Sequence, residues 1–167
     1  MGYTAGMGCG GCAGCGSGDG IELPAGLVTE IVMADERDAL AVAEDATPSL
    51  RWPGIDADGV DQAKLAILWA ILSGDAACAE RVEAFTPLAE VSEDGPWVFR
   101  VPPPLVAALA GIDVGRAPAV AATWARAEEL ELEDRAPDDV RRLLDGLRGV
   151  ARAAAVARKP LLMRVRL

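Results

Sequence analysis

The chain has 167 residues and a formal net charge of −10, and 51% of its residues are hydrophobic, many of them alanine. This length predicts one domain that can bury a core without metals or disulfides as scaffolding. The negative charge argues against a nucleic-acid ligand. No run of about 18 apolar residues predicts a membrane span, and no basic stretch followed by an apolar one predicts a secretory leader. We therefore expect a cytoplasmic protein.

Residues 1–20 have a composition of their own, nearly half of it glycine. Glycine loses more backbone entropy on ordering than any other residue, so this segment does not form a helix or a packed strand by itself. It contains three of the four cysteines, Cys9, Cys12 and Cys15. In a cytoplasmic protein such thiols are free, metal-bound or modified rather than disulfide-linked. We predict a Gly/Cys-rich metal-binding or flexible segment at 1–20, followed by a single α-rich globular domain at 21–167.

The spacing of these cysteines is suited to a metal centre. Gaps of two residues let successive thiolates curl around one centre, and the glycines supply the positive φ angles of a tight wrap and N–H groups for the sulfurs. Over seven residues the spacing resembles the first three ligands of bacterial ferredoxins, C-x2-C-x2-C-x3-C-P, but the fourth cysteine and the proline are missing. The resemblance implies an iron–sulfur cluster on Cys9, Cys12 and Cys15, with a fourth ligand from Cys78, Asp19, a partner or an exogenous thiol.

Other interpretations of the cysteine segment stay open. One is a zinc or copper site, although zinc ordinarily takes a fourth Cys or His ligand and the chain has no histidine. Another is that the cysteines are substrates of a modifying enzyme, or part of a peptide that is trimmed off later. The last is a tail whose cysteines have little function.

Apolar periodicity in the rest of the chain predicts mostly helices. It is clearest at 59–73, where Leu65, Leu68, Trp69 and Leu72 share one face, an aspartate caps the start and Ser73-Gly74 ends the helix. The helices expected in chain order cover 35–46, 59–73, 76–85, 102–110, 116–130 and 137–158. The expected strands cover 27–33, 97–101 and 161–167, and turns are expected at 51–54 and 93–96. The last strand alternates, which predicts a half-buried strand with Met163, Val165 and Leu167 on its apolar face. The predicted fold is mainly α (α+β), a compact helical domain with two or three short strands after the Gly/Cys-rich segment.

Several residues are expected to serve packing rather than chemistry. Gly146 and Gly149 lie inside the last predicted helix and each weakens it by about 1 kcal/mol relative to alanine, which is tolerable if a neighbouring helix approaches closely there. Cys78 shares a helix face with Val82 and Phe85 and is expected to act as a small buried hydrophobe. The four tryptophans are expected to anchor the core: Trp52, Trp69, Trp97 and Trp124.

Charged clusters have ordinary explanations as well. Asp56, Asp58 and Asp61 lack the spacing of a calcium loop and are expected to cap a helix. The acidic run at 128–134 is expected to be a solvated face. Between 146 and 167 the chain has six basic residues and no acid: Arg148, Arg152, Arg158, Lys159, Arg164 and Arg166. We expect them to lie against the acidic body of the protein, and a patch that docks an anionic partner is the alternative.

No catalytic residue can be assigned from the sequence. Without histidine there is no His-based triad or general base, and no Walker-type loop occurs. We therefore expect a small accessory subunit that carries a cysteine-ligated metal centre for electron transfer or cluster handling, works with a protein partner and is not an enzyme. The alternatives are a helical adaptor or maturation partner without a metal, and a protein whose N-terminal cysteines are modified after translation.

Overall fold

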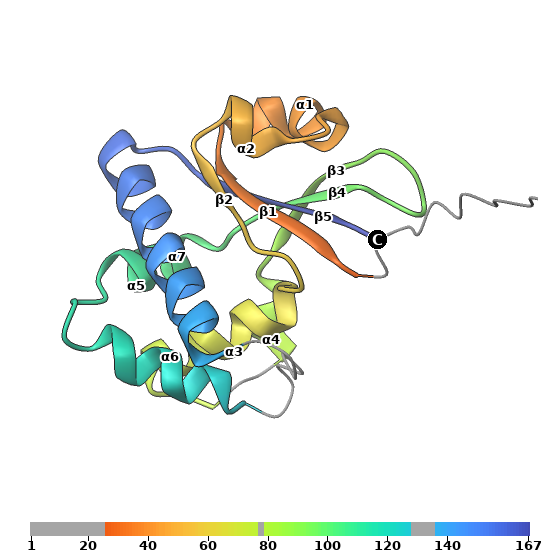
Figure 1. Cartoon of the computed structure of the whole chain (residues 1–167). Coiled ribbons are helices and arrows are strands. Elements are labelled where there is room, and N and C mark those ends of the chain that lie inside the picture. Colours follow the sequence, from red (N-terminus) through yellow and green to blue (C-terminus); the bar gives the residue numbers. More distant parts are fainter. Residues whose placement is uncertain (1–25, 77–78, 128–135) are drawn as a thin grey trace, which may run out of the picture.

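The computed structural model describes residues 26–76, 79–127 and 136–167. Of these residues, 52% are helical and 18% lie in strands, and the strands form one five-stranded antiparallel sheet. The prediction of a mainly helical domain with two or three short strands was therefore wrong. The sheet organises the described part of the chain, and helices cover both of its faces (Figure 1).

The centre of the sheet joins the two ends of the described chain. The strands are β1 (Val28–Met33), β2 (Gly54–Asp56), β3 (Thr86–Glu90), β4 (Trp97–Arg100) and β5 (Leu161–Arg166), in the order β2-β1-β5-β4-β3. β1 pairs with β5 over its whole length, from Val28 opposite Arg166 to Met33 opposite Leu161. Both central strands are rich in β-branched or long aliphatic residues, which suits a sheet buried on both faces.

The helices divide between the two faces of the sheet. A 3-10 turn η1 (Glu36–Asp38) and the short helices α1 (Ala39–Glu44) and α2 (Pro48–Arg51) cover one face. The larger layer on the other face contains α3 (Gln62–Ser73), α5 (Pro103–Ala110), α6 (Ala117–Ala125) and α7 (Pro137–Ala157). A short helix, α4 (Ala79–Glu83), follows α3. Figure 1 shows α1 and α2 on one side of the sheet and α7 with its neighbours on the other.

Each face of the sheet has its own hydrophobic core. Val32, Val98 and Leu162 pack against Val42 and neighbouring alanines of α1 in the smaller core. Their sequence neighbours point the opposite way, as side chains alternate along a strand. The larger core contains Ile31, Leu161 and Met163 of the sheet together with buried residues of α3, α5, α6 and α7: Leu65, Leu68, Leu105, Leu109, Trp124, Val140, Leu144 and Leu147.

Burial on both faces changes the expected character of β5. Met163 and Val165 lie in the larger core as predicted, but Leu162 and Arg164 on the opposite side are buried too, because α1 covers them. Leu167, expected on the apolar face, is 80% exposed. The predicted half-buried strand is a fully buried one apart from its end.

The missed elements are β2, β3 and α2. β2 has only three residues and follows Pro53, which was expected to belong to a turn. β3 contains Pro87 and an irregular register beside it, and proline weakens a strand prediction. Pro48 lies beyond the helix expected at 35–46, and it occupies the first turn of α2, where its missing N–H costs nothing.

Among the described residues, no neighbouring helix approaches the two glycines of α7 closely. A β-carbon added at Gly146 would lie 3.5 Å from side-chain atoms of Ile55, which belongs to the strand β2. One added at Gly149 would meet nothing within 4 Å. Gly149 therefore has no packing role among the described residues.

Within the described residues, no helix combines the length and the apolar character that crossing a membrane requires.

Candidate functional site

The predicted metal ligands Cys9, Cys12 and Cys15 lie outside the described residues, as do the two proposed fourth ligands of the chain, Cys78 and Asp19. The acidic run at 128–134 lies outside them as well. In the part of the chain that the structure describes, no group of three or more His, Cys, Asp or Glu side chains could hold a metal ion. The cysteine centre thus stays a prediction from the sequence.

The aspartates that precede α3 have separate structural roles. Asp61 is the N-cap of α3, and its Oδ1 accepts a hydrogen bond of 2.8 Å from the backbone N–H of Lys64, so the capping prediction is confirmed for it. Asp58 instead accepts from the backbone N–H of Thr29 in β1 at 3.2 Å. Asp56 accepts from the Ser49 hydroxyl at 3.2 Å. Capping therefore explains one of the three acids, and contacts to β1 and α2 explain the other two.

Of the four tryptophans, Trp124 is the one that is fully buried. Its exposed fraction is 0%, and its indole Nε1–H donates to the backbone carbonyl of Lys64 at 3.2 Å. Trp52, Trp69 and Trp97 are half-buried. The Arg81 guanidinium lies 4.8 Å from the centre of the Trp69 ring, so this tryptophan carries a cation–π contact at the edge of the core.

Four of the six C-terminal basic residues bind within the chain, as expected. Arg148 and Arg152 on α7 both donate to the backbone carbonyl of Ile112, at 3.1 Å and 2.7 Å, just beyond the end of α5. Lys159 forms an ion pair of 3.0 Å with Asp35. The last of the four, Arg164, pairs with Glu30 at 3.0 Å. The side chains of Arg158 and Arg166 make no hydrogen bond or ion pair to another described residue.

The pair of Glu30 and Arg164 is the most buried charged contact of the described chain. The two residues face each other across β1 and β5, and their exposed fractions are 5% and 4%. The second carboxylate oxygen of Glu30 accepts from the backbone N–H and the hydroxyl of Ser49, and Arg164 Nε donates to the Ala43 carbonyl. Burial lowers the pKa of the Arg164 guanidinium, and the Glu30 carboxylate opposes that shift. No buried side-chain nitrogen or oxygen of the pair lacks a hydrogen-bond partner, so the pair is explained by the fold.

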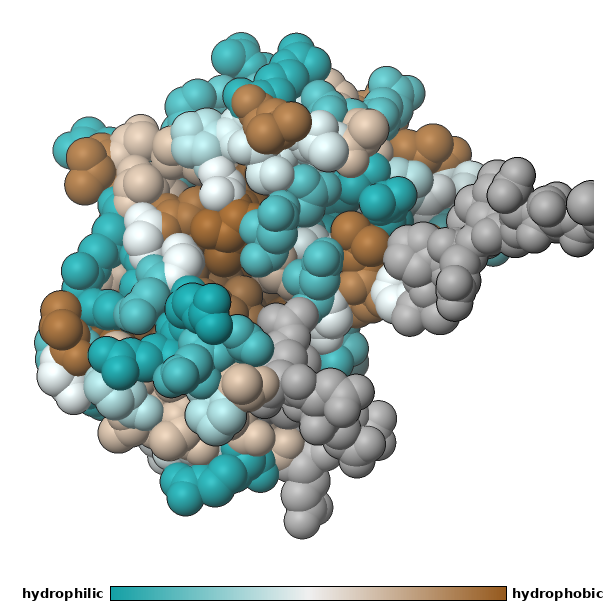
Figure 2. Space-filling view, in the orientation of Figure 1, coloured by the Kyte–Doolittle hydropathy of each residue, from teal (hydrophilic) through white to brown (hydrophobic). Residues whose placement is uncertain are grey.

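Two grooves are candidates for binding. The β2–α7 groove has a volume of about 580 Å³ and is lined by Ile55, Asp56, Asp139, Arg142, Leu143 and Gly146. Figure 2 shows apolar surface in a hollow between the positions of β2 and α7. Asp139 and Arg142 at its rim form an ion pair of 2.7 Å.

The α5–α7 groove lies where the C-terminal end of α7 meets the start of α5 and η1, and its volume is about 390 Å³. Apolar side chains line it as well, including Val101 directly after β4, Val106 of α5 and Leu161 of β5. Its charged lining consists of Arg100, Arg158, Lys159 and Glu36. Sequence analysis missed this groove, because its lining comes from segments spread between residues 36 and 161. The one available signal was the basic pair that stands before Pro160 at a helix end.

Searches of protein-family models, of curated proteins and of solved structures each return no match to this chain. Its function is therefore argued from its own residues.

Proposed function

We propose that this chain is a non-catalytic cytoplasmic accessory protein that carries a thiolate-ligated metal centre, an iron–sulfur cluster, on Cys9, Cys12 and Cys15. Its role would be electron transfer or cluster handling for a protein partner. The observation that carries the proposal is the spacing of three cysteines, two residues apart each, in a glycine-rich segment. Thiolates are the usual ligands of such clusters, and glycine permits the chain to wrap closely around one.

The α/β domain supports this division of roles. The described residues of its two cores and its central β1–β5 pair lie between 26 and 167. In the sequence, the cysteine segment precedes β1, whose first residue is Val28. A metal centre on that segment would be attached to this domain through the chain that leads into β1.

The test is metal analysis of the full-length chain, purified without oxygen and without an affinity tag. We expect iron and acid-labile sulfide in whole-number ratios and a visible charge-transfer absorption. The Cys12→Ser variant should lose iron and colour, and the Ser17→Ala variant, a control in the same segment, should keep both. The Cys78→Ser variant then asks whether Cys78 is the fourth ligand. Colourless and metal-free wild-type protein would contradict the proposal, and a mass shift confined to the N-terminal peptide would favour modified cysteines instead.

A second candidate, a non-enzymatic adaptor, is favoured by the edge of β2. Met33 N–H bonds to the Pro53 carbonyl and Ala57 N–H to the Thr29 carbonyl, so the residues at 53, 55 and 57 direct their backbone groups at β1. In an antiparallel pair the intervening residues, Gly54 and Asp56, then direct theirs outward. Outward backbone groups beside a groove that is lined by both apolar and charged residues suit an added peptide strand.

The two glycines of α7 provide a matched test of the adaptor function. Gly146 lines the β2–α7 groove, whereas a β-carbon at Gly149 meets nothing. A partner identified by cross-linking and then purified should bind the wild-type chain and the Gly149→Leu variant, and should bind the Gly146→Leu variant far more weakly. It should also bind a chain that lacks residues 1–20, once circular dichroism has shown that chain to be folded. Equal binding by the two leucine variants would exclude the β2–α7 groove as the docking site.

A further inference from the structure

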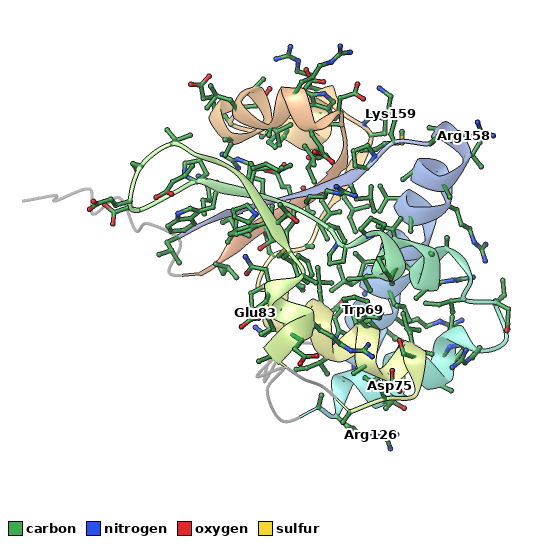
Figure 3. All side chains as sticks on the ribbon, turned by 180° about the vertical axis from the view of Figure 1, so that it is seen from behind. Trp69, Asp75, Glu83, Arg126, Arg158 and Lys159 are labelled. Carbon is green, nitrogen blue, oxygen red and sulfur yellow. The ribbon has the colours of Figure 1, made fainter. Side chains whose placement is uncertain are left out.

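The α5–α7 groove combines an apolar interior with a cationic mouth. Val101 and Leu161 on its inner side are buried, at 3% and 1% exposure, and Val106 is half-buried. Its volume of about 390 Å³ lies within the range of roughly 300–1,000 Å³ that is typical of small-molecule sites. Figure 3 shows Arg158 and Lys159 next to each other at the C-terminal end of α7, far from Trp69 and Asp75.

The charges at the mouth leave one cation without a partner among the described residues. Arg100 pairs with Glu36, and Lys159 pairs with Asp35, both at 3.0 Å. All four of these side chains are at least 35% exposed, so water screens both pairs and either cation can exchange its partner for a ligand. Arg158 is exposed and makes no ion pair within the described chain. In a protein whose net charge is −10, this local excess of positive charge favours an anion at one place.

The backbone of Arg158 is a second, independent observation. Among the described residues other than glycine, Arg158 alone has a positive φ. Its φ is 53° and its ψ is 41°, so it ends α7 in the left-handed conformation that glycine usually adopts there. Its N–H bonds to the Ala154 and Ala155 carbonyls, a role that glycine would fill equally well without a strained β-carbon. Compared with glycine, arginine therefore contributes only its charged guanidinium group at this position. Non-glycine residues held in this conformation cluster at functional sites.

We propose that the α5–α7 groove binds a small organic carboxylate whose apolar body enters against Val101, Val106 and Leu161 and whose carboxylate pairs with Arg158 at the mouth. Arginine suits this role because its planar guanidinium can bind a carboxylate through two parallel hydrogen bonds. Lys159 and Arg100 flank the same mouth and add to the attraction. The inference is independent of the proposed metal centre, since it uses residues of the described domain and none of the cysteines.

The experiment compares an acid with its uncharged analogue on the full-length chain. The probes are 3-phenylpropionate, 3-phenylpropanamide and inorganic phosphate, and affinity is measured by calorimetry and by NMR shifts of groove residues. We expect 3-phenylpropionate to bind with shifts at Val101, Val106 and Leu161. The amide should bind at least about tenfold more weakly, because it lacks the charge that Arg158 recognises. Equal affinity of acid and amide would refute the charged mouth, and phosphate binding as tightly as the acid would refute the apolar interior.

Variants separate binding from folding. Arg158→Gly should weaken 3-phenylpropionate binding by about tenfold or more while raising the Tm by about 2–4 °C, because it relieves the strained conformation. Ala107→Glu places a carboxylate in the lining of the groove on an exposed helical position and should abolish binding. Arg141→Gln, an exposed cation on α7 that does not line the groove, should leave the affinity unchanged. Wild-type affinity in both Arg158→Gly and Ala107→Glu would overturn the proposal.

Discussion

The buried pair of Glu30 and Arg164 allows a quantitative test of the fold. In the Arg164→Met variant, one Glu30 oxygen loses its partner at 3.0 Å, the Ala43 carbonyl loses its donor at 3.2 Å, and the carboxylate keeps only the hydrogen bonds from Ser49. Removing one partner of a buried ion pair costs about 3–5 kcal/mol, because the other charge stays buried and uncompensated. At roughly 2–4 °C per kcal/mol for a chain of this size, the Tm should fall by about 6–20 °C.

The double variant Glu30→Leu/Arg164→Met decides whether the pairing itself is the cause. It buries no charge, so its expected cost is about 1–3 kcal/mol, which is the cost of leaving the Ala43 carbonyl unpaired. Urea unfolding followed by circular dichroism on the wild type, both single variants and the double variant gives the coupling energy. We expect the single losses to sum to at least about 3 kcal/mol more than the double loss. Additive losses would show that the two charges do not depend on each other, and would refute the argument.

Three further predictions concern stability. Gly149→Ala should raise the free energy of unfolding by about 0.5–1 kcal/mol in urea titrations, because alanine favours the helix and its β-carbon meets nothing within 4 Å. Trp124→Phe should lower it by about 1–3 kcal/mol, because the Lys64 carbonyl loses its indole donor, and an unchanged midpoint would contradict this. The hydrogen bond from Lys159 holds the pKa of Asp35 below its usual value, so that stabilisation is present above the unfolded pKa of about 3.9 and is lost as the pH falls through the lowered one. The Tm advantage of the wild type over Asp35→Asn should therefore shrink in acid, and a constant difference between pH 7 and pH 2 would disprove it.

The long and strongly patterned elements could be predicted from the sequence. α7 was expected at 137–158 and spans Pro137–Ala157, because Val140, Leu144 and Leu147 recur at helical spacing on one face. β1 and β5 were expected from runs of aliphatic residues at the two ends of the domain, and they pair with each other. Periodicity depends on neighbours in sequence, so it identifies an element whenever one face of that element is buried consistently.

The sheet itself could not be predicted, because its remaining strands depend on tertiary contacts. β2 consists of three residues that are strand-like only through their register with β1. β3 contains Pro87 and pairs with β4 through an irregular register. Its residues do not alternate between apolar and polar in a way that would predict a strand. The pairing of Glu30 with Arg164, which are 134 residues apart in the sequence, also depends on tertiary structure. Taken separately, each charged residue predicts an exposed position.

The two proposed sites differ in what the sequence could reveal about them. Metal ligands at fixed spacing in one segment form a motif, whereas the α5–α7 groove is assembled from η1, β4, α5, α7 and β5 and has no linear signature. The described lining of the groove includes none of the three cysteines, so the two proposed sites share no residue. Substitutions at sites that share no partner usually have additive effects. The gain of stability and the loss of binding caused by Arg158→Gly should therefore be the same whether Cys12 is present or replaced by serine, and a non-additive pair would mean that the two proposed sites act on each other.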